Sequence, residues 1–303
     1  MIPNIKAILL SLLVTFLWST SFIIIKWGLV EIPPLTFAGL RYSIAFFCIF
    51  PFAFKKSNLE KIKTLSKKDW YKLLSLGLLF YFFTQGAQFI GLSLLTSVTV
   101  SLVLNFTPVI VAVLAILLIN EVPTPLQWGG AAMFIAGVVI YFFPVNFGSN
   151  EITGLIIMLI GVLANALSAV LGRNINSKKN ISPFIVTVVS MGTGAVLLLS
   201  TGIVLQGLPS ISILNLMYLL WLAIINTAFA FIIWNFTLRS LTAMESSIIN
   251  GTMLIQIAIL AYFFLGESVS LKEGVGLLIA GFGAVLVQLK FKAGFRKTKI
   301  VKP

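Results

Sequence analysis

Residues 96–140 read TSVTVSLVLNFTPVIVAVLAILLINEVPTPLQWGGAAMFIAGVVI, and residues 242–286 read TAMESSIINGTMLIQIAILAYFFLGESVSLKEGVGLLIAGFGAVL. The two segments match at a constant offset of 146, which places Glu121 on Glu267 and aligns a threonine, a serine and two glycines. A repeat of about half the chain predicts two large halves and not a solenoid of short units. We therefore treat the chain as one apolar unit written twice.

The composition excludes a soluble globule. Of the 303 residues, 59% are hydrophobic and 10% are charged, and the mean hydropathy is +1.09. A soluble domain carries about 25% charged residues, so this chain has too little polar surface to cover a globule in water. The net charge of +13 would suit nucleic acid, but the basic residues lie in short clusters between apolar runs, as membrane topology requires. We expect a lipid bilayer around the chain and no nucleic-acid partner.

Few residues can carry covalent or metal chemistry, which argues against an enzyme. The chain has one cysteine, Cys48, inside an apolar run, and it has no histidine. A single thiol forms neither an intramolecular disulfide nor a structural zinc site, and triads or shuttles that use histidine are excluded. We expect no metal, no cofactor and no catalytic residue. A lipid-modifying membrane enzyme is the rival interpretation, but no cluster of acids or histidines at an interface supports it.

Ten runs of about 20 mostly apolar residues predict ten membrane-spanning helices. The runs cover 5–27, 35–54, 73–92, 97–119, 127–144, 153–172, 183–204, 214–237, 246–265 and 273–290. The first run follows Lys6 without an Ala-x-Ala site, so it is expected to be a retained span and not a cleaved signal. The fold class is therefore predicted as an all-α integral membrane protein.

Lysine and arginine mark the cytoplasmic side of a membrane protein. The longest polar stretch, residues 55–72, contains seven lysines and lies on the same side as both termini when the number of spans is even. With that side in the cytoplasm, 18 of the 21 basic residues lie inside, and Lys26, Arg41 and Lys272 are left near the outer face. This count predicts a multi-pass protein of the plasma or inner membrane with both termini cytoplasmic.

Five spans per half is an odd number, so the two halves enter the membrane in opposite senses. Residues 1–147 form the first five-helix repeat and residues 148–303 form the second, inverted one. Glu121 and Glu267 must then lie at opposite faces of the membrane. Inverted repeats are typical of transporters that work by alternating access, with the substrate held between the halves.

Several stretches resemble the EamA-type branch of the drug/metabolite transporter superfamily. They are Trp18-Ser19-Thr20-Ser21-Phe22 with Lys26, Pro33-Pro34 with Arg41, the Thr-Ser-Val start of the fourth run with Asn105-x-x-Pro108, and Glu121 followed by Gln127-Trp128-Gly129-Gly130. The second half departs from this pattern, with Ala164 at the place of Trp18 and Leu254 at that of Pro108. The resemblance implies a ten-span carrier, commonly an exporter of amino acids or other small metabolites. A lipid flippase on the same fold is the alternative.

Polar side chains in mid-span are costly in hydrocarbon and tend to face the interior of a bundle. In the third run Tyr81, Gln85 and Gln88 share one helical face. The repeat offset places Thr227 and Trp234 on the corresponding face of the eighth run. We expect these faces to line the substrate cavity. The alternative is that the glutamines hold neighbouring helices together by hydrogen bonds.

The fourth and ninth runs carry a second set of polar positions. Asn105 precedes Pro108, which frees a backbone carbonyl and predicts a kink with a role in gating, and Asn250 follows in the ninth run. Trp18 and Asn165 occupy neighbouring positions in the first and sixth runs. We expect all four polar or aromatic side chains to bind substrate. Close helix packing, or a lipid-facing Trp18, is the alternative.

Small residues spaced by three or four mark the fifth and tenth runs, among them Gly130, Gly137, Gly276 and Gly283. This spacing lets two helices approach closely. We interpret these glycines as scaffold, or as the contact face of a homodimer.

The eight acidic residues all lie at the ends of runs or between them, so a proton relay through the bundle is not expected. Transport is predicted to be a uniport, or to couple to protons only through Glu121, Glu267 or the substrate itself. Coupling to sodium is a further alternative, because sodium sites can be built from carbonyls and hydroxyls without a carboxylate. Arg41 is expected to extend toward the interface or to pair with Glu31.

Overall fold

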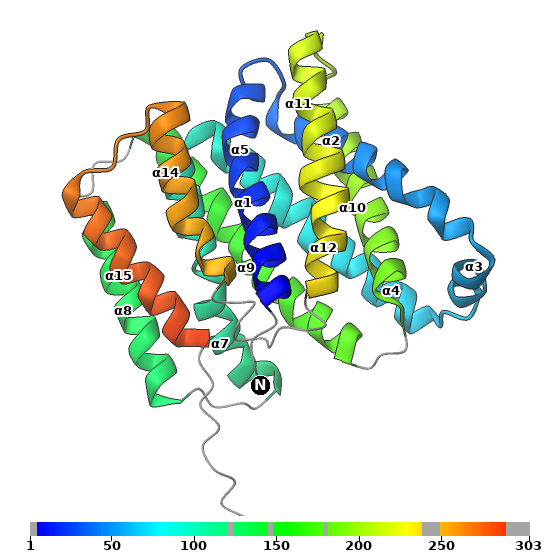
Figure 1. Cartoon of the computed structure of the whole chain (residues 1–303), viewed down its shortest axis with the longest axis horizontal. Helices are drawn as coiled ribbons and strands as arrows, with labels where there is room; N and C mark the ends of the chain where they lie inside the picture. Colours follow the sequence, from blue (N-terminus) through cyan, green and yellow to red (C-terminus); the bar gives the residue numbers. More distant parts are fainter. Residues whose placement is uncertain (1–4, 120–123, 145–147, 178–180, 238–248, 289–303) are drawn as a thin grey trace, which may run out of the picture.

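The computed structural model describes residues 5–119, 124–144, 148–177, 181–237 and 249–288, and every regular element in these ranges is a helix (Figure 1). The first half contains α1 (Ile5–Gly28), α2 (Pro34–Ile49), η1 (Phe50–Phe54), α3 (Lys56–Lys63), α4 (Lys67–Leu76), η2 (Gly77–Gln85), α5 (Gly86–Leu94), α6 (Ser97–Leu104), α7 (Thr107–Ile119) and α8 (Pro125–Phe142). The second half contains α9 (Ser149–Ser177), α10 (Pro183–Gln206), α11 (Ile213–Ala223), η3 (Ile224–Phe229), α12 (Ala230–Thr237), α14 (Met253–Leu265) and α15 (Leu271–Gln288). The all-helical prediction is confirmed for these residues.

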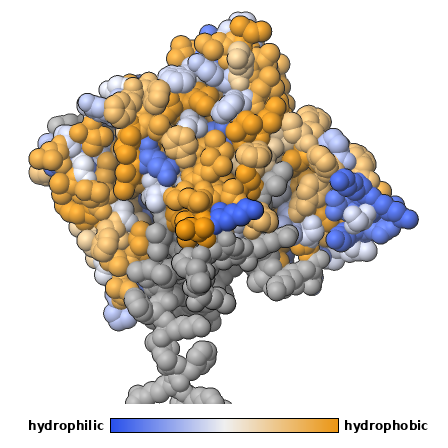
Figure 2. Space-filling model, viewed as in Figure 1, coloured by the Kyte–Doolittle hydropathy of each residue, from blue (hydrophilic) through white to orange (hydrophobic). Residues whose placement is uncertain are grey.

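Six helical segments are long and apolar enough to cross a membrane, namely Ile5–Gly28, Pro34–Phe54, Lys67–Leu94, Pro125–Phe142, Ser149–Gly172 and Pro183–Gln206. Shorter apolar segments occupy the predicted fourth, eighth and ninth runs. Large apolar side chains point outward along the bundle, with Phe47 at 66% and Val204 at 81% exposure. Figure 2 shows the resulting hydrophobic surface over most of one face. Such a surface fits lipid and not water.

Two helices begin with the same cap at positions related by the repeat. At the start of α8, Gln127 accepts a hydrogen bond from the Thr124 amide at 2.9 Å, and the Thr124 hydroxyl accepts one from the Gln127 amide. Before α15, Glu273 accepts from the Ser270 amide at 2.7 Å, and Ser270 accepts from the Glu273 amide. Each pair satisfies two amides that a helix N-terminus leaves open. Positions that are 146 residues apart therefore also share the geometry of their helix caps.

The helices α8 and α15 pack against each other in antiparallel directions. A Cβ added at Gly130 would lie 2.9 Å from the Gly283 carbonyl oxygen, and one added at Gly137 would lie 2.6 Å from that of Gly276. Further along the pair, the Gln127 side chain donates to the Val287 carbonyl at 3.0 Å. Only glycine allows this approach, so the scaffold interpretation of these residues is confirmed.

The helices α2 and α10 form a second antiparallel pair. A Cβ at Gly39 would lie 2.5 Å from Leu199 Cα, and one at Gly202 would lie 2.6 Å from the Thr36 amide nitrogen. Glycine again sets the distance between two helices that hold corresponding places in the two halves.

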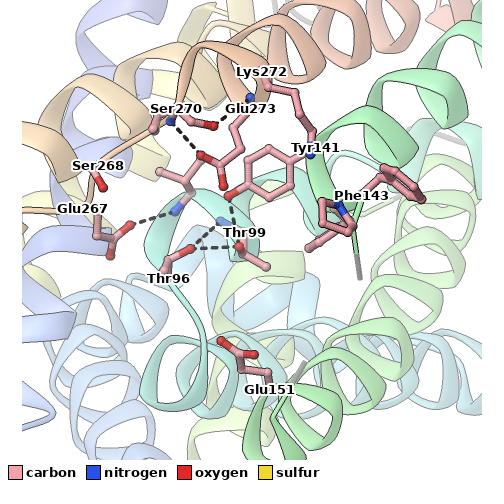
Figure 3. Close-up of a pocket in the computed structure, with 14 residues that line it drawn as sticks. Thr96, Thr99, Tyr141, Phe143, Glu151, Glu267, Ser268, Ser270, Lys272 and Glu273 are labelled. Carbon is pink, nitrogen blue, oxygen red and sulfur yellow. Dashed lines mark hydrogen bonds between the residues drawn. The ribbon is translucent and has the colours of Figure 1, made fainter. Parts of the chain in front are cut away.

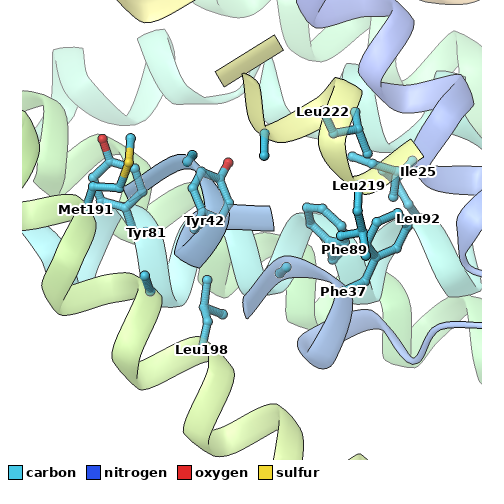
Figure 4. Close-up of a cluster of buried hydrophobic side chains, with 14 of the residues drawn as sticks. Ile25, Phe37, Tyr42, Tyr81, Phe89, Leu92, Met191, Leu198, Leu219 and Leu222 are labelled. Carbon is cyan, nitrogen blue, oxygen red and sulfur yellow. The ribbon is translucent and has the colours of Figure 1, made fainter. Parts of the chain in front are cut away.

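The first helix of each half packs against the other half. The helix α1 lies against α12 and α14, whereas α9 lies against η2 and α5 and against α6 and α7. Buried side chains from both halves share one hydrophobic cluster, as Figure 4 shows for Phe37, Phe89, Leu198 and Leu222.

Candidate functional site

The indole of Trp18 lies between α1 and the eighth span. Its Nε1 donates to the Asn226 carbonyl at 3.1 Å, and its ring centroid lies 5.4 Å from that of Phe231 and 5.2 Å from that of Trp234. Two predicted site residues, Trp18 and Trp234, are thus in contact although they come from different halves. The ring packs on protein over this face and is half-buried.

Asn226 is a residue that the sequence reasoning missed. Its side chain is fully buried, and its Nδ2 donates to the Leu17 carbonyl at 2.5 Å, to Thr20 Oγ1 at 3.1 Å and to Ser21 Oγ at 2.8 Å. Its Oδ1 has no hydrogen-bond partner in the described part of the chain. A lone asparagine inside an apolar run was the available signal, since such residues tend to face a bundle interior.

Two π-helices occupy matching places in the third and eighth spans. In η2 the Thr84 hydroxyl donates to the Leu79 carbonyl at 2.9 Å, and in η3 the Thr227 hydroxyl donates to the Leu222 carbonyl at 2.8 Å. In both cases the hydroxyl reaches back five residues and satisfies a carbonyl. Single-turn π-bulges occur frequently at functional sites, so these two segments are candidates for the functional site.

Arg41 anchors the second π-helix. Its Nε donates to Thr227 Oγ1 at 3.0 Å, and its guanidinium lies 5.5 Å from the Tyr42 ring and 6.0 Å from the Phe89 ring. The residue is only 4% exposed, so the expectation that it extends toward the interface or pairs with Glu31 is wrong. Arg41 stays buried because Thr227 and the aromatic rings take the place of water around its guanidinium.

The helices of spans four and nine are interrupted at matching positions. Between α6 and α7, Phe106 N donates to the Val103 carbonyl at 3.0 Å, and before α14, Thr252 N donates to the Ile249 carbonyl at 3.1 Å. The first break precedes Pro108, and the Thr107 hydroxyl satisfies the Leu104 carbonyl at 2.7 Å. The second break has no proline, so the kink does not depend on that residue alone.

Each break is bonded to the first span of the other half. The Asn165 side chain in α9 donates to Thr107 Oγ1 at 3.0 Å. In the other half, Ser19 in α1 donates to Gln256 Oε1 at 3.0 Å, and Gln256 donates to Thr252 Oγ1 at 2.9 Å. Polar side chains thus meet where two helices lose regular backbone bonding.

The remaining predicted site residues have different surroundings. Tyr81 is 4% exposed and packs edge-on against Tyr42, and Thr227 is fully buried with its hydroxyl engaged as described above. Gln85 and Gln88 are half-buried, and their side chains make no hydrogen bond within the described ranges. Asn105 is half-buried and donates to the Ser101 carbonyl at 2.8 Å, while Asn250 is exposed. The two glutamines therefore keep amides that a ligand can use.

A cavity of about 430 Å³ lies at one end of the bundle, near the start of α6 and the start of α15 (Figure 3). Glu267 accepts from the Ser97 amide at 2.8 Å and from the Val98 amide at 3.3 Å, and Thr99 and Tyr141 share a hydrogen bond of 3.2 Å. None of the predicted substrate residues lines this cavity.

Two charged side chains, Lys26 and Glu31, lie at the same end of the bundle. Lys26 Nζ donates to the Leu95 carbonyl at 2.6 Å. Hydrogen bonds from the Asn215 and Ser212 side chains hold the pKa of the Glu31 carboxyl below its usual value. Within the described residues, no group of three His, Cys, Asp or Glu side chains could hold a metal ion. Glu121 lies outside the described residues.

Comparison with known proteins supplies the family. The profile of the EamA-like transporter family matches twice, over residues 5–143 and 152–289. An uncharacterized transporter of Archaeoglobus fulgidus is 26% identical over 293 residues, which are 95% of this chain and 99% of the relative. The uncharacterized transporter YoaV of Bacillus subtilis is 25% identical over 301 residues, with 95% and 98% coverage.

Two further matches are more distant. An S-adenosylmethionine/S-adenosylhomocysteine transporter of Chlamydia trachomatis is 29% identical over 146 residues, which are 48% of this chain and 42% of the relative. A solved crystal structure superposes with a TM-score of 0.66 at 17% identity, covering 93% of this chain and 97% of the other. At that identity the structural match shows a shared fold.

Proposed function

Because the chain belongs to the EamA-like transporter family, we propose that it carries a small metabolite, most simply an amino acid or a related compound, out of the cell by alternating access. It is a multi-pass membrane transporter and not an enzyme. The direction of transport and the substrate class are the parts that we propose. The family resemblance supports both, and the polar side chains at the helix breaks support a polar solute.

Two inverted five-helix halves, residues 1–147 and 148–303, form the proposed architecture. The family profile matches each half separately. The pairs α8 with α15 and α2 with α10 are antiparallel, as inversion requires of helices at corresponding places. The capping pairs and the helix breaks follow the same offset. Ten spans in total are proposed, of which six meet the length and hydropathy of a full crossing by themselves.

The observation that carries the proposal is the pair of matching breaks in spans four and nine. Discontinuous helices near mid-membrane leave carbonyls and amides free to bind a polar solute. Here each break is bonded to the first span of the opposite half, through Asn165 to Thr107 and through Ser19 to Gln256. A movement of one half against the other changes these contacts, so binding and the conformational change involve the same groups.

The proposed substrate ligands surround these breaks and the π-helices. They are Trp18, Tyr81, Gln85, Gln88, Asn105, Asn165, Thr227, Trp234 and Asn250, with Pro108 as the gating kink. The free amides of Gln85 and Gln88 suit a carboxylate or hydroxyl group, and Trp18 with Trp234 offers an apolar wall. The Chlamydia trachomatis relative is named for S-adenosylmethionine and S-adenosylhomocysteine, which supports a small organic solute as cargo.

The orientation that we propose places both termini and residues 55–72 in the cytoplasm, because this side holds most of the basic residues. The proposed transport in the cell membrane is a uniport, or it couples to protons only through Glu121, Glu267 or the substrate itself, since the acidic residues lie at span ends and between spans. Efflux of substrate from loaded proteoliposomes should proceed without an imposed pH gradient. A flux that requires the gradient, and that a mid-span substitution abolishes, contradicts the uniport.

The experiment that tests the function has two stages. Metabolites in the medium of overexpressing cells and of cells that lack the protein are compared first, and the enriched solute is then loaded into proteoliposomes. Gln85→Ala, Asn105→Ala and Trp234→Ala should each lower flux while protein levels in the membrane hold. Phe263→Ala, at a side chain that is 73% exposed on the apolar surface, is the matched control. Wild-type flux from all three site variants contradicts the proposed site.

A further inference from the structure

The connection between the second and third spans is the most concentrated basic surface of the described chain. Residues 55–72 hold seven lysines and two acids, Glu60 and Asp69, which gives a net charge of seven minus two, or +5. Figure 2 shows this hydrophilic patch at the right of the view, where Figure 1 places α3. Directly beside it the surface is hydrophobic. Topology explains the side of the membrane on which these lysines lie, but it does not explain how closely they cluster.

Five lysines in this patch present an unshared charge to the surroundings. Lys56, Lys61, Lys63, Lys67 and Lys68 are exposed and make no hydrogen bond or ion pair with the described residues. The two lysines at the edges behave differently, because Lys55 lies 5.2 Å from the Phe52 ring and Lys72 donates to Asn174 at 3.5 Å. The five lysines between them are therefore free for an external anion.

Aromatic side chains flank the same lysines. Phe52 is 51%, Phe54 62% and Tyr71 75% exposed, and Trp70 is 37% exposed. Exposed aromatic rings next to lysines are typical of the level at which a membrane meets water. The underside of α3 is held to the bundle by Ile62, which packs on the hydrophobic core. The patch is therefore fixed at the end of two spans and lies beside the lipid-facing surface.

We propose that residues 52–72, here called the basic connection, bind the phosphate headgroups of anionic phospholipids in the leaflet that they face. Clusters of four to eight lysines immediately next to a membrane span attract anionic lipid, and each lysine near such a surface strengthens the attraction about fivefold. The charge supplies the affinity, and the exposed rings enter the headgroup region between the lysines. The anionic lipid then stabilises the end of α2 and the start of the third span.

Purified full-length protein in nanodiscs of phosphatidylcholine, with or without 30 mol% phosphatidylglycerol (about a third of the lipid, enough to surround the basic connection), tests this proposal. The wild type should retain phosphatidylglycerol at least about tenfold more strongly than phosphatidylcholine, as counted by native mass spectrometry. Screening by about 0.5 M salt should remove most of the preference. The quadruple variant Lys61→Gln, Lys63→Gln, Lys67→Gln and Lys68→Gln should lose it, and the corresponding Lys→Arg variant should keep it.

The matched control removes the same charge elsewhere, with Arg296→Gln, Lys297→Gln, Lys299→Gln and Lys302→Gln in the C-terminal tail. The proposal is contradicted when this control loses the preference as fully as the Lys→Gln variant, because net charge would then be the cause. It is also contradicted when the Lys→Gln variant keeps the wild-type preference. If soluble RNA or an acidic protein displaces phosphatidylglycerol from the wild type and binds more tightly, the partner is not the lipid. These outcomes do not depend on the transported solute.

Discussion

Two contacts between the halves occupy corresponding places and differ in chemistry. In the first, here called the polar seam, Asn226 of η3 donates to Leu17, Thr20 and Ser21 of α1. In the second, here called the packed seam, Gly161 of α9 lies so close to Ala87 of α5 that an added Cβ would be 2.5 Å from the alanine Cβ. There Thr84 makes one hydrogen bond to the Gly161 carbonyl, at 3.3 Å.

The comparison shows that the two halves share a helical frame while their side chains have diverged. Hydrogen bonds of the polar seam can be exchanged for bonds to a solute or to water, because both partners are polar side chains or carbonyls. The packed seam relies on close contact of small residues, and a solute cannot replace that contact. Substitutions in the two seams should therefore differ in what they cost.

The largest effect is expected at the packed seam. Gly161→Val forces a branched side chain against Ala87 Cβ, which cannot rotate away, so stability should fall by about 3 kcal/mol, the upper end for overpacking. The matched control is Thr15→Val at the corresponding position of α1, which loses a bond to the Leu12 carbonyl at 3.0 Å and a weak bond from Gln256 at 3.4 Å. Thermal unfolding in detergent measures both. If the two variants unfold at the same temperature, the packed seam is not as tight as the structure shows.

A smaller loss of stability is expected at the polar seam. Asn226→Leu removes three hydrogen bonds, and such bonds in membrane proteins average about 0.6 kcal/mol each, so the free energy of unfolding should fall by roughly 2 kcal/mol. Thr187→Val removes one side-chain bond within its own helix, α10, at a residue outside the proposed site, and serves as the control. Both are compared by unfolding in detergent and by flux. An Asn226→Leu protein with full stability and full flux would show that the polar seam is incidental.

The smallest effect concerns pH at Glu31, in the connection that follows α1. Glu31 follows α1 and accepts a hydrogen bond from the Ser212 amide, at 3.4 Å, before α11. Its pKa is lowered in the folded state, so its contribution to stability is present above the ordinary carboxyl pKa and is lost as pH falls through the folded pKa. Thermal unfolding of the wild type should therefore show a small acid-dependent decrease that Glu31→Gln lacks. If the thermal unfolding of the wild type and of Glu31→Gln depends on pH in the same way, the contact of Glu31 does not stabilise the fold.

Sequence reasoning recovered the parts of the fold that repeat. The glycines at which α8 and α15 approach each other are among the residues that match at one offset and that were interpreted as scaffold. The caps at Thr124 and Ser270 follow the same offset, but they were not predicted. The helix break before Pro108 is likewise local. These features depend on neighbouring residues or on pairs that the repeat makes visible.

Contacts between unlike residues were not predictable in this way. Asn226 corresponds to Phe80 in the first half, so the repeat gave no reason to select it. Arg41 was expected to extend toward the interface or to pair with Glu31. Its partner in the structure, Thr227, is 186 residues away, so no neighbouring residue pointed to it. Tyr81 and Gln85 also lie in the π-helix η2, where regular helical spacing does not hold, and Tyr81 is buried. The amino-acid composition does not indicate that a π-helix forms at this position.

The central claim is that the two halves are inverted. It is tested most directly by Thr124→Cys and Ser270→Cys, each introduced separately in a Cys48→Ser background, because these caps correspond by the repeat. A membrane-impermeant maleimide applied to whole cells should label the Ser270→Cys protein, while the Thr124→Cys protein should react only after the cytoplasmic face is exposed. Labelling of both positions from one and the same side would contradict the account.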